Sequence, residues 1–436
     1  MLAAFIPTVA SIILCSPLAE PTPPAVTPVD AAAGWKLYSG PDAAKQWRGF
    51  KQAGFPDKGW TAANGTLSHA AGAGGGDIIT ADQFDDFEIA CQFKLAPKAN
   101  SGIIFRVAEK HDATWQTGPE FQVFADTTGG AKPTDSHSAG ALYGLYPPGP
   151  GKVLRPAGQL NDARIWLRNG VLQHWLNGVK LVDVVIFDAS GKPTPEWLAK
   201  IAASKFKEYE GFGLQPKGHI ALQDHGDEVL YSDIKIRDLG APMPGEKVLF
   251  NGKDLTGWMP VVPDLIAKQQ DPAQVWEVKD GILICKGNPV GYIRTTDKYT
   301  NFVLKLQWRF NPVTKRAGNS GVLLRMVGDE KVWPKSVEAQ LQSGSAGDFW
   351  NIDNVKMKTD AARTNGRNTK KTHGAERPVG EWNEYEIIVN KGDVILKVNG
   401  EELNRATDVE EVPGYICLQS EGAEIQFRDI RIVPLP

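Results

Sequence analysis

Apolar and polar residues alternate over much of the chain, and one alternating segment occurs twice. Residues Gly218–Ile236 (GHIALQDHGDEVLYSDIKI) and Gly414–Ile432 (GYICLQSEGAEIQFRDIRI) align without a gap. Alternation with a period of two is typical of a strand that has one face in a core. In both copies the alternation stops at a glycine, Gly226 or Gly422, and then resumes as Asp-Ile-x-Ile. Each copy therefore predicts a hairpin of two strands.

Other segments extend this repeat over most of each half. The matching pairs are 87–97 with 302–312, 102–106 with 321–325, and the Glu-x-Gln segments 120–122 with 338–340. Many short strands with regular turns predict an antiparallel β-sandwich in each half. We expect domains at 33–240 and 245–436, joined by a Pro- and Gly-containing segment. One helix is predicted, Pro195–Tyr209, as an insertion in the first half only.

The N-terminal residues have the composition of a targeting segment. The apolar run Leu2–Leu14 has the length of a signal-peptide core, although no Lys or Arg precedes it. We expect a signal peptide at 1–19, a Pro-rich linker at 20–32 that joins no packed core, and export to the periplasm or the extracellular space. In an exported protein, Cys285 and Cys417 are candidates for a disulfide.

Charge and hydropathy exclude two classes of partner. The formal net charge of the chain is −3, and no long basic face is apparent. Both features argue against a nucleic-acid partner. Beyond the N-terminal run, no segment is long and apolar enough to predict a membrane span.

Candidate site residues occur first on the strand that contains Glu120 and Gln122. The two side chains point the same way, ~6.6 Å apart along the strand, and Arg106 on the preceding strand is expected on the same side. Unpaired charge is costly inside a core, so this face is predicted to be the concave, wet side of the sandwich, where a ligand binds. The alternative is a solvent-exposed face with an ordinary Arg–Glu pair.

Two histidines are candidate bases. His225 shares a strand face with Gln223 and is next to Asp224, and an imidazole titrates near neutral pH. The alternative is a hairpin tip in which Asp224 caps a backbone amide. His174 is a second candidate, although a histidine beside Trp175 in a strand can simply pack in the core.

Loop residues complete the set of candidates. Tyr143 and Tyr146 suit stacking on a sugar ring, or they are ordinary loop aromatics. Asp126 and His137 flank a polar loop, and with Glu120 they are candidate ligands of a divalent metal, although their spacing matches no known metal signature.

The motifs of common hydrolases are absent from the sequence. It contains no Glu-x-Asp-x-x-Glu of the kind that retaining glucanases use and no Gly-x-Ser-x-Gly. Glu120 and Asp126 would lie ~20 Å apart on an extended strand, too far to act on one glycosidic bond. A carboxylate pair drawn from different strands stays open.

The first half resembles the 3-keto-disaccharide hydrolase domain family, whose fold is similar to that of concanavalin A-type lectins and glucanases. The resemblance rests on the segments Asn100–Arg106, Gly118–Gln122, Gly140–Pro147, His174–Gly178, Ser204–Phe206 and Leu222–Gly226. It implies an all-β fold of two tandem concanavalin A-like sandwiches of jelly-roll type. The second half resembles the same family, but Leu396 and Glu421 replace the two histidines.

The resemblance implies an enzyme that cleaves 3-keto-glycosides. A ketone at C3 acidifies the proton at C2, so one base starts an elimination and water then adds back. His225 or His174 is the expected base, Glu120 and Arg106 are further catalytic residues, and the partner is a carbohydrate. Arg106 or a divalent ion would hold the enolate. Gln122, Tyr143, Tyr146, Gln223, Asp126 and His137 are expected to contact the substrate. The rival reading is a non-catalytic pair of carbohydrate-binding modules with Trp and Tyr as stacking platforms.

Overall fold

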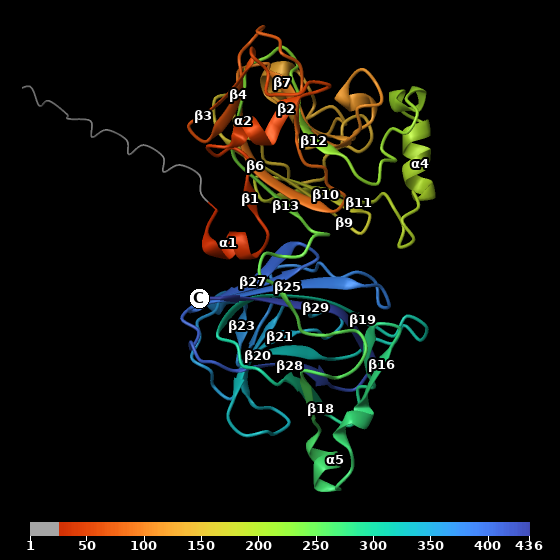
Figure 1. The fold of residues 1–436 in the computed structure, drawn as a ribbon, viewed down its shortest axis with the longest axis vertical. Helices are drawn as coiled ribbons and strands as arrows, with labels where there is room; N and C mark the ends of the chain where they lie inside the picture. The colour runs from red at the N-terminus through yellow and green to blue at the C-terminus, as the bar shows by residue number, and fades with distance from the viewer. Residues whose placement is uncertain (1–25) are drawn as a thin grey trace, which may run out of the picture.

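The computed structural model describes residues 26–436, which form two β-sandwiches stacked along the long axis of the molecule (Figure 1). Each sandwich contains two sheets, and all pairings between the named strands are antiparallel. The prediction of two tandem antiparallel sandwiches is confirmed. The predicted signal peptide, 1–19, and the first part of the predicted linker lie outside the described residues.

In the first half, one sheet has eight strands and the other has five. The eight-stranded sheet contains β1 (Lys36–Leu37), β3 (Trp60–Ala63), β4 (Thr66–His69), β6 (Phe87–Leu95), β9 (Asn161–Arg168), β10 (Val171–Leu176), β11 (Val179–Val185) and β13 (Val229–Asp238). The five-stranded sheet has the order β2 (Trp47–Gly49), β5 (Ile78–Thr80), β12 (His219–Leu222), β7 (Asn100–Val107) and β8 (Glu120–Phe124).

The second half has two eight-stranded sheets. The first contains β14 (Lys247–Val248), β16 (Trp276–Lys279), β17 (Ile282–Cys285), β19 (Asn301–Phe310), β25 (Asn383–Asn390), β26 (Asp393–Val398), β27 (Glu401–Ala406) and β29 (Ile425–Leu435). The other contains β15 (Trp258–Val261), β18 (Gly291–Thr295), β20 (Gly321–Val327), β21 (Lys335–Gln340), β22 (Phe349–Ile352), β23 (Thr364–Asn365), β24 (Asn368–Thr369) and β28 (Tyr415–Ser420).

The helices are short and lie outside the sheets. They are α1 (Pro28–Ala32), α2 (Ala43–Gln46), α3 (Asp126–Gly129), α4 (Pro195–Ala202) and α5 (Pro263–Ala267), with 3-10 turns η1 (Thr114–Gln116), η2 (Lys205–Glu208), η3 (Pro272–Val275) and η4 (Ala361–Arg363). The predicted helix 195–209 is therefore two elements, because Ser204 accepts a hydrogen bond from the amide of Phe206 and starts η2. None of the helices in residues 26–436 is long and apolar enough to cross a membrane.

One prediction about local structure is wrong, and one candidate disulfide is not formed. The end of the proposed linker is packed: Thr27 caps α1, and Ala32 is buried in a small apolar cluster with Val303 and Val433 of the second half. Cys285 and Cys417 are free, because they belong to different apolar clusters. Cys285 lies between the sheets of the second half, and Cys417 lies on the outer side of one of them.

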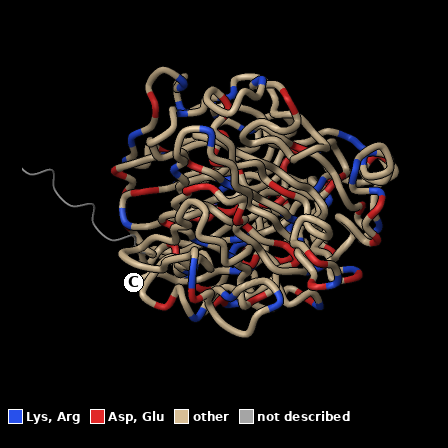
Figure 2. Tube along the Cα trace, turned by 90° about the horizontal axis from the view of Figure 1, so that it is seen from above, with Lys and Arg blue, Asp and Glu red and all other residues tan. Residues whose placement is uncertain are grey.

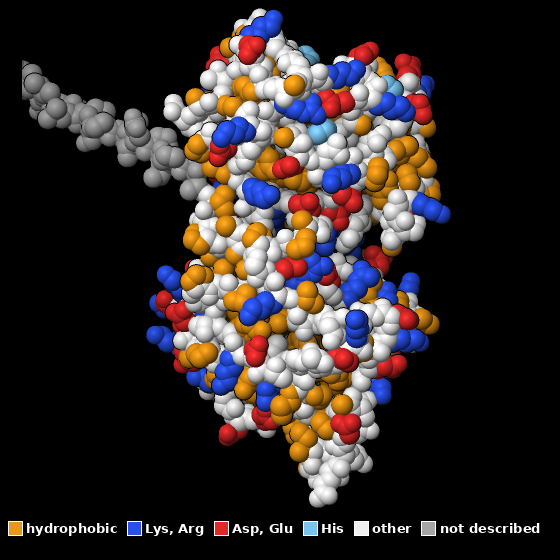
Figure 3. Space-filling model, viewed as in Figure 1, with side chains coloured by type: hydrophobic (Ala, Val, Ile, Leu, Met, Phe, Trp, Pro, Cys, Tyr) orange, Lys and Arg blue, Asp and Glu red, His pale blue; other side chains and the backbone are white. Residues whose placement is uncertain are grey.

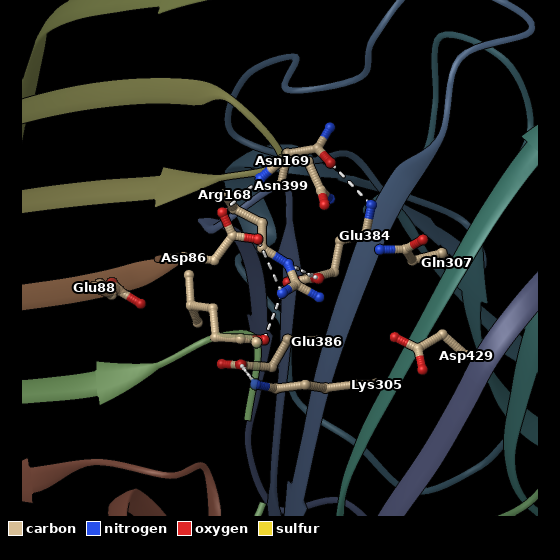
Figure 4. A network of polar contacts seen from close by, with 12 residues as sticks. Asp86, Glu88, Arg168, Asn169, Lys305, Gln307, Glu384, Glu386, Asn399 and Asp429 are labelled. Atoms are coloured by element: carbon tan, nitrogen blue, oxygen red, sulfur yellow. Dashed lines mark hydrogen bonds and ion pairs between the residues drawn. The ribbon is translucent and has the colours of Figure 1, made fainter. Parts of the chain in front are cut away.

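The two halves meet through the eight-stranded sheet of the first half and the sheet of the second half that contains β19, β25 and β29 (Figure 1). Charged side chains join them: Arg168 on β9 pairs with Glu384 on β25 at 3.1 Å, as the close-up shows (Figure 4). Acidic and basic side chains gather along this junction, where the surface is hollowed (Figure 3). Elsewhere the two signs of charge are interspersed along the trace (Figure 2). The five-stranded sheet of the first half therefore faces away from the second half.

Candidate active site

The outer face of the five-stranded sheet contains the predicted Glu120 and Gln122. Strand β8 alternates, so Phe121 and Val123 enter the core between the sheets while Glu120 and Gln122 point outward. The shared face of the two polar side chains is as predicted. The face is not freely wet, because Glu120 is only 5% exposed and Gln122 only 2%. The loop that contains Tyr143 pairs with the edge of β8, where the backbone amide of Tyr143 donates to the carbonyl of Glu120.

Gly102 on β7 makes room for the carboxyl group of Glu120. A Cβ atom placed on Gly102 would lie 2.4 Å from Glu120 Oε1. The strand pairing places Gly102 directly opposite Gln122, and its carbonyl oxygen accepts a hydrogen bond from the amide of Gln223. The Asn-Ser-Gly motif of the sequence thus forms the floor of the site, since only glycine permits this approach.

Two amide side chains flank the carboxyl group. Gln122 donates through Nε2 to the carbonyl of His137 at 3.1 Å and to Asn100 Oδ1 at 3.3 Å. Its Oε1 is buried and has no hydrogen-bond partner among the described residues. Buried polar atoms are normally paired, so a free amide oxygen on this face is suited to a ligand hydroxyl. Gln223 immediately follows β12, whose last residue, Leu222, packs in the core.

The site contains a second acid that sequence reasoning missed. Asp77 immediately precedes β5 and accepts hydrogen bonds from the hydroxyl of Thr114 and the amide of Asp224. Burial, and after it the charge of Asp77, raise the pKa of Glu120 to about 8, against an opposing effect of Lys205. Burial also raises the pKa of Asp77. At neutral pH Glu120 is therefore protonated and able to donate a proton.

Lys205 supplies positive charge from the first-half insertion. Its Nζ lies 4.5 Å from the ring centre of Tyr143 and 5.3 Å from that of Trp115, and it donates to the Tyr143 hydroxyl at 3.3 Å. His137 packs edge-on against Tyr143, with ring centres 5.0 Å apart, and its Nδ1 is 2.7 Å from Asp135. Lys205 belongs to the Ser204–Phe206 segment, which contributed to the family resemblance. The pattern of apolar and polar residues gave no indication of its role.

His225 lies in the exposed turn between β12 and β13 rather than on a strand face. Asp224 accepts a hydrogen bond from the amide of Gly226 at 2.9 Å, as the turn alternative required. The histidine that contacts Asp224 is His69, at 3.2 Å. His225 nevertheless lies close enough to Asp77 to lower the pKa of that carboxyl. It is therefore at the margin of the site, with its imidazole open to a substrate.

His174 does not belong to this site. It lies on β10 with no exposed surface, and its ring packs 4.9 Å from Phe121 and 6.0 Å from Phe105, centre to centre. Burial lowers the pKa of His174 to about 3, so the imidazole is neutral and a poor base. The sequence indicated a catalytic candidate here, but the residue fills the core between the sheets, as Leu396 does in the second half.

Replacing His174 with leucine should therefore leave turnover within about twofold and should not lower the free energy of unfolding by more than ~1 kcal/mol. The Nε2 atom of His174 has no partner in the described structure, and its removal offsets the loss of the weak 3.4 Å contact with Gly140. Steady-state kinetics and urea unfolding of the variant measure both quantities. A folded variant with a large loss of kcat would instead place His174 in the reaction.

Arg106 is also displaced from the predicted site. Its φ is +53°, in the left-handed region, so the alternation of β7 breaks there and the side chain turns toward Asp85, to which it bonds at 2.7 Å. The matching Arg325 has a φ of +50° and donates to four acceptors, three of them carbonyl groups. In both halves this arginine anchors a strand bulge.

The predicted metal ligands do not converge. Asp126 is buried, where it binds the amide of Ala139 and pairs with Lys152 at 2.6 Å. Within residues 26–436, no three His, Cys, Asp or Glu side chains are grouped to hold a metal ion. Tyr146 lies beside α4, where it donates to Glu196 and stacks with Lys200.

The second half repeats the acid but only part of its surroundings. Glu338 lies over Gly321 as Glu120 lies over Gly102, and burial, then Glu421, raises its pKa to about 8. By strand register, Tyr292 takes the place of Asp77 beside Gln419. The insertion that provides Lys205 has no counterpart. The second half thus retains the buried acid and the amides, and has Glu421 in place of His225.

Comparison with known proteins agrees with the repeated organisation. The 3-keto-alpha-glucoside-1,2-lyase-like domain family matches residues 34–237 and again 245–433. A "3-keto-disaccharide hydrolase" of Bacteroides thetaiotaomicron is 27% identical over 242 residues, which cover 49% of this chain and 80% of that protein. A crystal structure titled "putative glycosyl hydrolase" from Parabacteroides distasonis is 27% identical, with a TM-score of 0.44, and covers 50% of this chain and 100% of its own. The chain belongs to the 3-keto-alpha-glucoside-1,2-lyase-like domain family.

Proposed function

We propose that the first half cleaves 3-keto-glycosides on the outer face of β7, β8 and β12. The observation that carries the proposal is Glu120, a buried carboxyl group with a pKa of about 8 that lies among amide groups and near a lysine. Such a group is an acid at neutral pH. The family membership supports a glycoside-cleaving activity, and the 3-keto substrate and the mechanism below are our proposal.

The proposed reaction is an elimination followed by hydration. His225 removes the proton at C2, which the C3 ketone acidifies, and an enolate forms. The enolate electrons then form the C1–C2 double bond as the C1–O bond breaks, and Glu120 protonates the departing oxygen. Water adds across the double bond and gives the free 3-keto sugar, so the net result is hydrolysis.

Nearby side chains have defined roles in this proposal. Lys205 stabilises the negative charge on the C3 oxygen, the role that the sequence analysis gave to Arg106. The free Oε1 of Gln122 accepts a sugar hydroxyl, and the Tyr143 ring borders the leaving group. Asp77 holds the turn that contains His225 through the amide of Asp224.

The test compares a glucoside before and after oxidation at C3, using the full chain in D2O with and without a chelator. We expect cleavage of the oxidised glucoside only, with deuterium at C2 of the product, and a loss of about 10²-fold or more in kcat for His225→Ala. His137→Ala serves as the comparison, because His137 is the other exposed histidine in the described part of the first half. Full turnover in His225→Ala removes that residue from the role of base. Binding of both sugars without cleavage of either would favour the carbohydrate-binding reading.

A further inference from the structure

A cavity of about 690 Å³ lies at the junction of the two halves, remote from the face that contains Glu120. Phe187 and Arg106 contribute to its first-half wall, and Arg309, Arg377 and Arg428 to its second-half wall. The volume is in the range of pockets that hold a ligand of about disaccharide or trisaccharide size. Nothing in the proposed reaction uses this cavity.

Two of these arginines are held in place by Trp382. The guanidinium of Arg309 lies 4.4 Å from the Trp382 ring centre, and that of Arg428 lies 4.1 Å from it. The Nε of Arg309 donates to Gln426 at 2.9 Å, and the Nε of Arg428 donates to Gln307 at 2.7 Å. Arg309 lies directly across from Gln426 in the β19–β29 pairing, and Gln307 from Arg428. The Trp382 ring and the side-chain amides of Gln426 and Gln307 thus hold both guanidinium groups in a fixed orientation without a ligand.

The terminal nitrogens of these groups have no protein acceptor. Within residues 26–436, Arg309, Arg377 and Arg428 have no carboxylate within 4 Å, and their terminal nitrogens donate no hydrogen bond. Partial burial lowers the pKa of all three, and Arg309 lowers that of Arg428 further. Three guanidinium groups without an ion-pair partner among residues 26–436 therefore border one half-buried space, and Glu381, which also lines it, partly opposes the lowering of the pKa of Arg377.

Several other charges at the junction are paired. Arg168 bonds to Glu384 and Asp86, and Arg237 bonds to Glu88 and Glu386. On the first-half wall of the cavity, Asp85 and Asp86 are engaged by Arg106 and Arg168. Asp188 and Glu381 line the cavity as well, but neither carboxylate lies within 4 Å of the guanidinium nitrogens of Arg309, Arg377 or Arg428, so the terminal nitrogens of these three arginines stay available to a ligand.

We propose that this cavity binds an anionic oligosaccharide, with its carboxylate or sulfate group on Arg309, Arg377 and Arg428. Guanidinium groups hold such oxyanions through paired N–H donors, and a fixed orientation lowers the cost of binding. The sugar part of this assignment rests on the proposed function, whereas the anion part rests on the arginines alone.

Calorimetric titration of the full chain with digalacturonate, cellobiose and sodium sulfate tests the proposal. We expect digalacturonate to bind, cellobiose not to bind at this cavity, and sulfate to bind more weakly than digalacturonate. Binding should weaken as NaCl is raised from 50 to 500 mM, because part of the attraction is screened. The double variant Arg309→Gln/Arg428→Gln should lose affinity for digalacturonate by ~10–100-fold.

Arg294→Gln is the matched control, since Arg294 also stacks on an aromatic ring, that of Tyr415, but outside the cavity. Equal affinity of the double variant and the wild type, with an unchanged melting temperature, would overturn the site. Sulfate binding as tightly as digalacturonate would overturn the carbohydrate assignment. Cleavage of a 3-keto-glucoside should be unchanged in the double variant, so a failure of the proposed function leaves this binding readout intact.

Discussion

Replacing Glu120 with glutamine should lower kcat/KM on a 3-keto-glucoside by about 10²–10⁴-fold, the range that a general acid contributes. Glutamine has nearly the same shape and fits over Gly102, so the fold and the packing are preserved. It has no acid proton, and the leaving oxygen would depart unprotonated. Leaving-group dependence provides a second readout, because glucosides with acidic phenol leaving groups should be affected least.

The pH profile of the wild type tests the same role of Glu120 through the direction in which kcat/KM changes with pH. The pKa of Glu120 is about 8, so its acid form predominates below that pH and is lost above it. We therefore expect kcat/KM to fall as the pH rises through about 8, and this falling limb to be absent in Glu120→Gln. A limb that persists in the variant would belong to another group.

Glu338→Gln is the matched control in the second half. Glu338 has the same burial, the same underlying glycine and a pKa of about 8, but no lysine in the place of Lys205. Its replacement should leave turnover unchanged. Loss of turnover in Glu338→Gln together with full turnover in Glu120→Gln would assign the activity to the second half.

Replacing Arg237 with methionine should lower the free energy of unfolding by about 3–5 kcal/mol, as removal of one partner from a buried ion pair does. Arg237 is buried at the junction, where it bonds to Glu88 of its own half at 2.6 Å and to Glu386 of the other half at 2.6 Å. Lys305 and Lys397 also pair with Glu386, each at 3.3 Å, and the close-up shows Lys305 beside it (Figure 4). Without Arg237, Glu386 loses its closest cation and Glu88 keeps Arg164 but loses its second partner, while both carboxylates remain in a buried environment.

The same cluster sets a dependence of stability on pH. Burial alone would raise the pKa of Glu88, but Arg164, Arg237 and Lys397 lower it to about 2, and similar charges lower that of Glu386. A carboxyl group with a lowered folded-state pKa stabilises the protein above its unfolded pKa of about 4.5, and this stability is lost as the pH falls toward 2. The difference between wild type and Arg237→Met should therefore narrow below about pH 4.

Urea unfolding at pH 7 and pH 3 measures both effects. Arg405→Met is the control, because Arg405 pairs with Glu402 on the exposed surface, and such pairs contribute about 0–1 kcal/mol. A loss of less than ~1 kcal/mol in Arg237→Met, like that of the control, would show that the junction does not depend on this cluster.

The sequence alone was sufficient for the repeat, the sandwich class and part of the site. A period of two residues decides which side chains share a strand face, so the common face of Glu120 and Gln122 followed from β8 itself. Whether the polar side chains of a strand lie on an outer face or inside the core did not follow from the sequence. Alternation cannot distinguish a polar residue on an outer face from one inside the core, and His174 is a core residue between two phenylalanine rings.

Only the tertiary structure decided which groups act together. The left-handed backbone conformation of Arg106 turns its own side chain away from Glu120. No pattern of apolar positions in the sequence indicates such a bulge. Asp77, which directly precedes β5, and Lys205, in the insertion, are far from Glu120 along the chain but act on it in the fold. The pKa of Glu120 depends on its burial and on its distances from these two groups. The ion cluster around Arg237 and the arginines around Trp382 arise where two separately encoded sandwiches meet. Contacts across that junction depend on how the domains dock, which is a property of two whole surfaces and not of any local stretch of sequence.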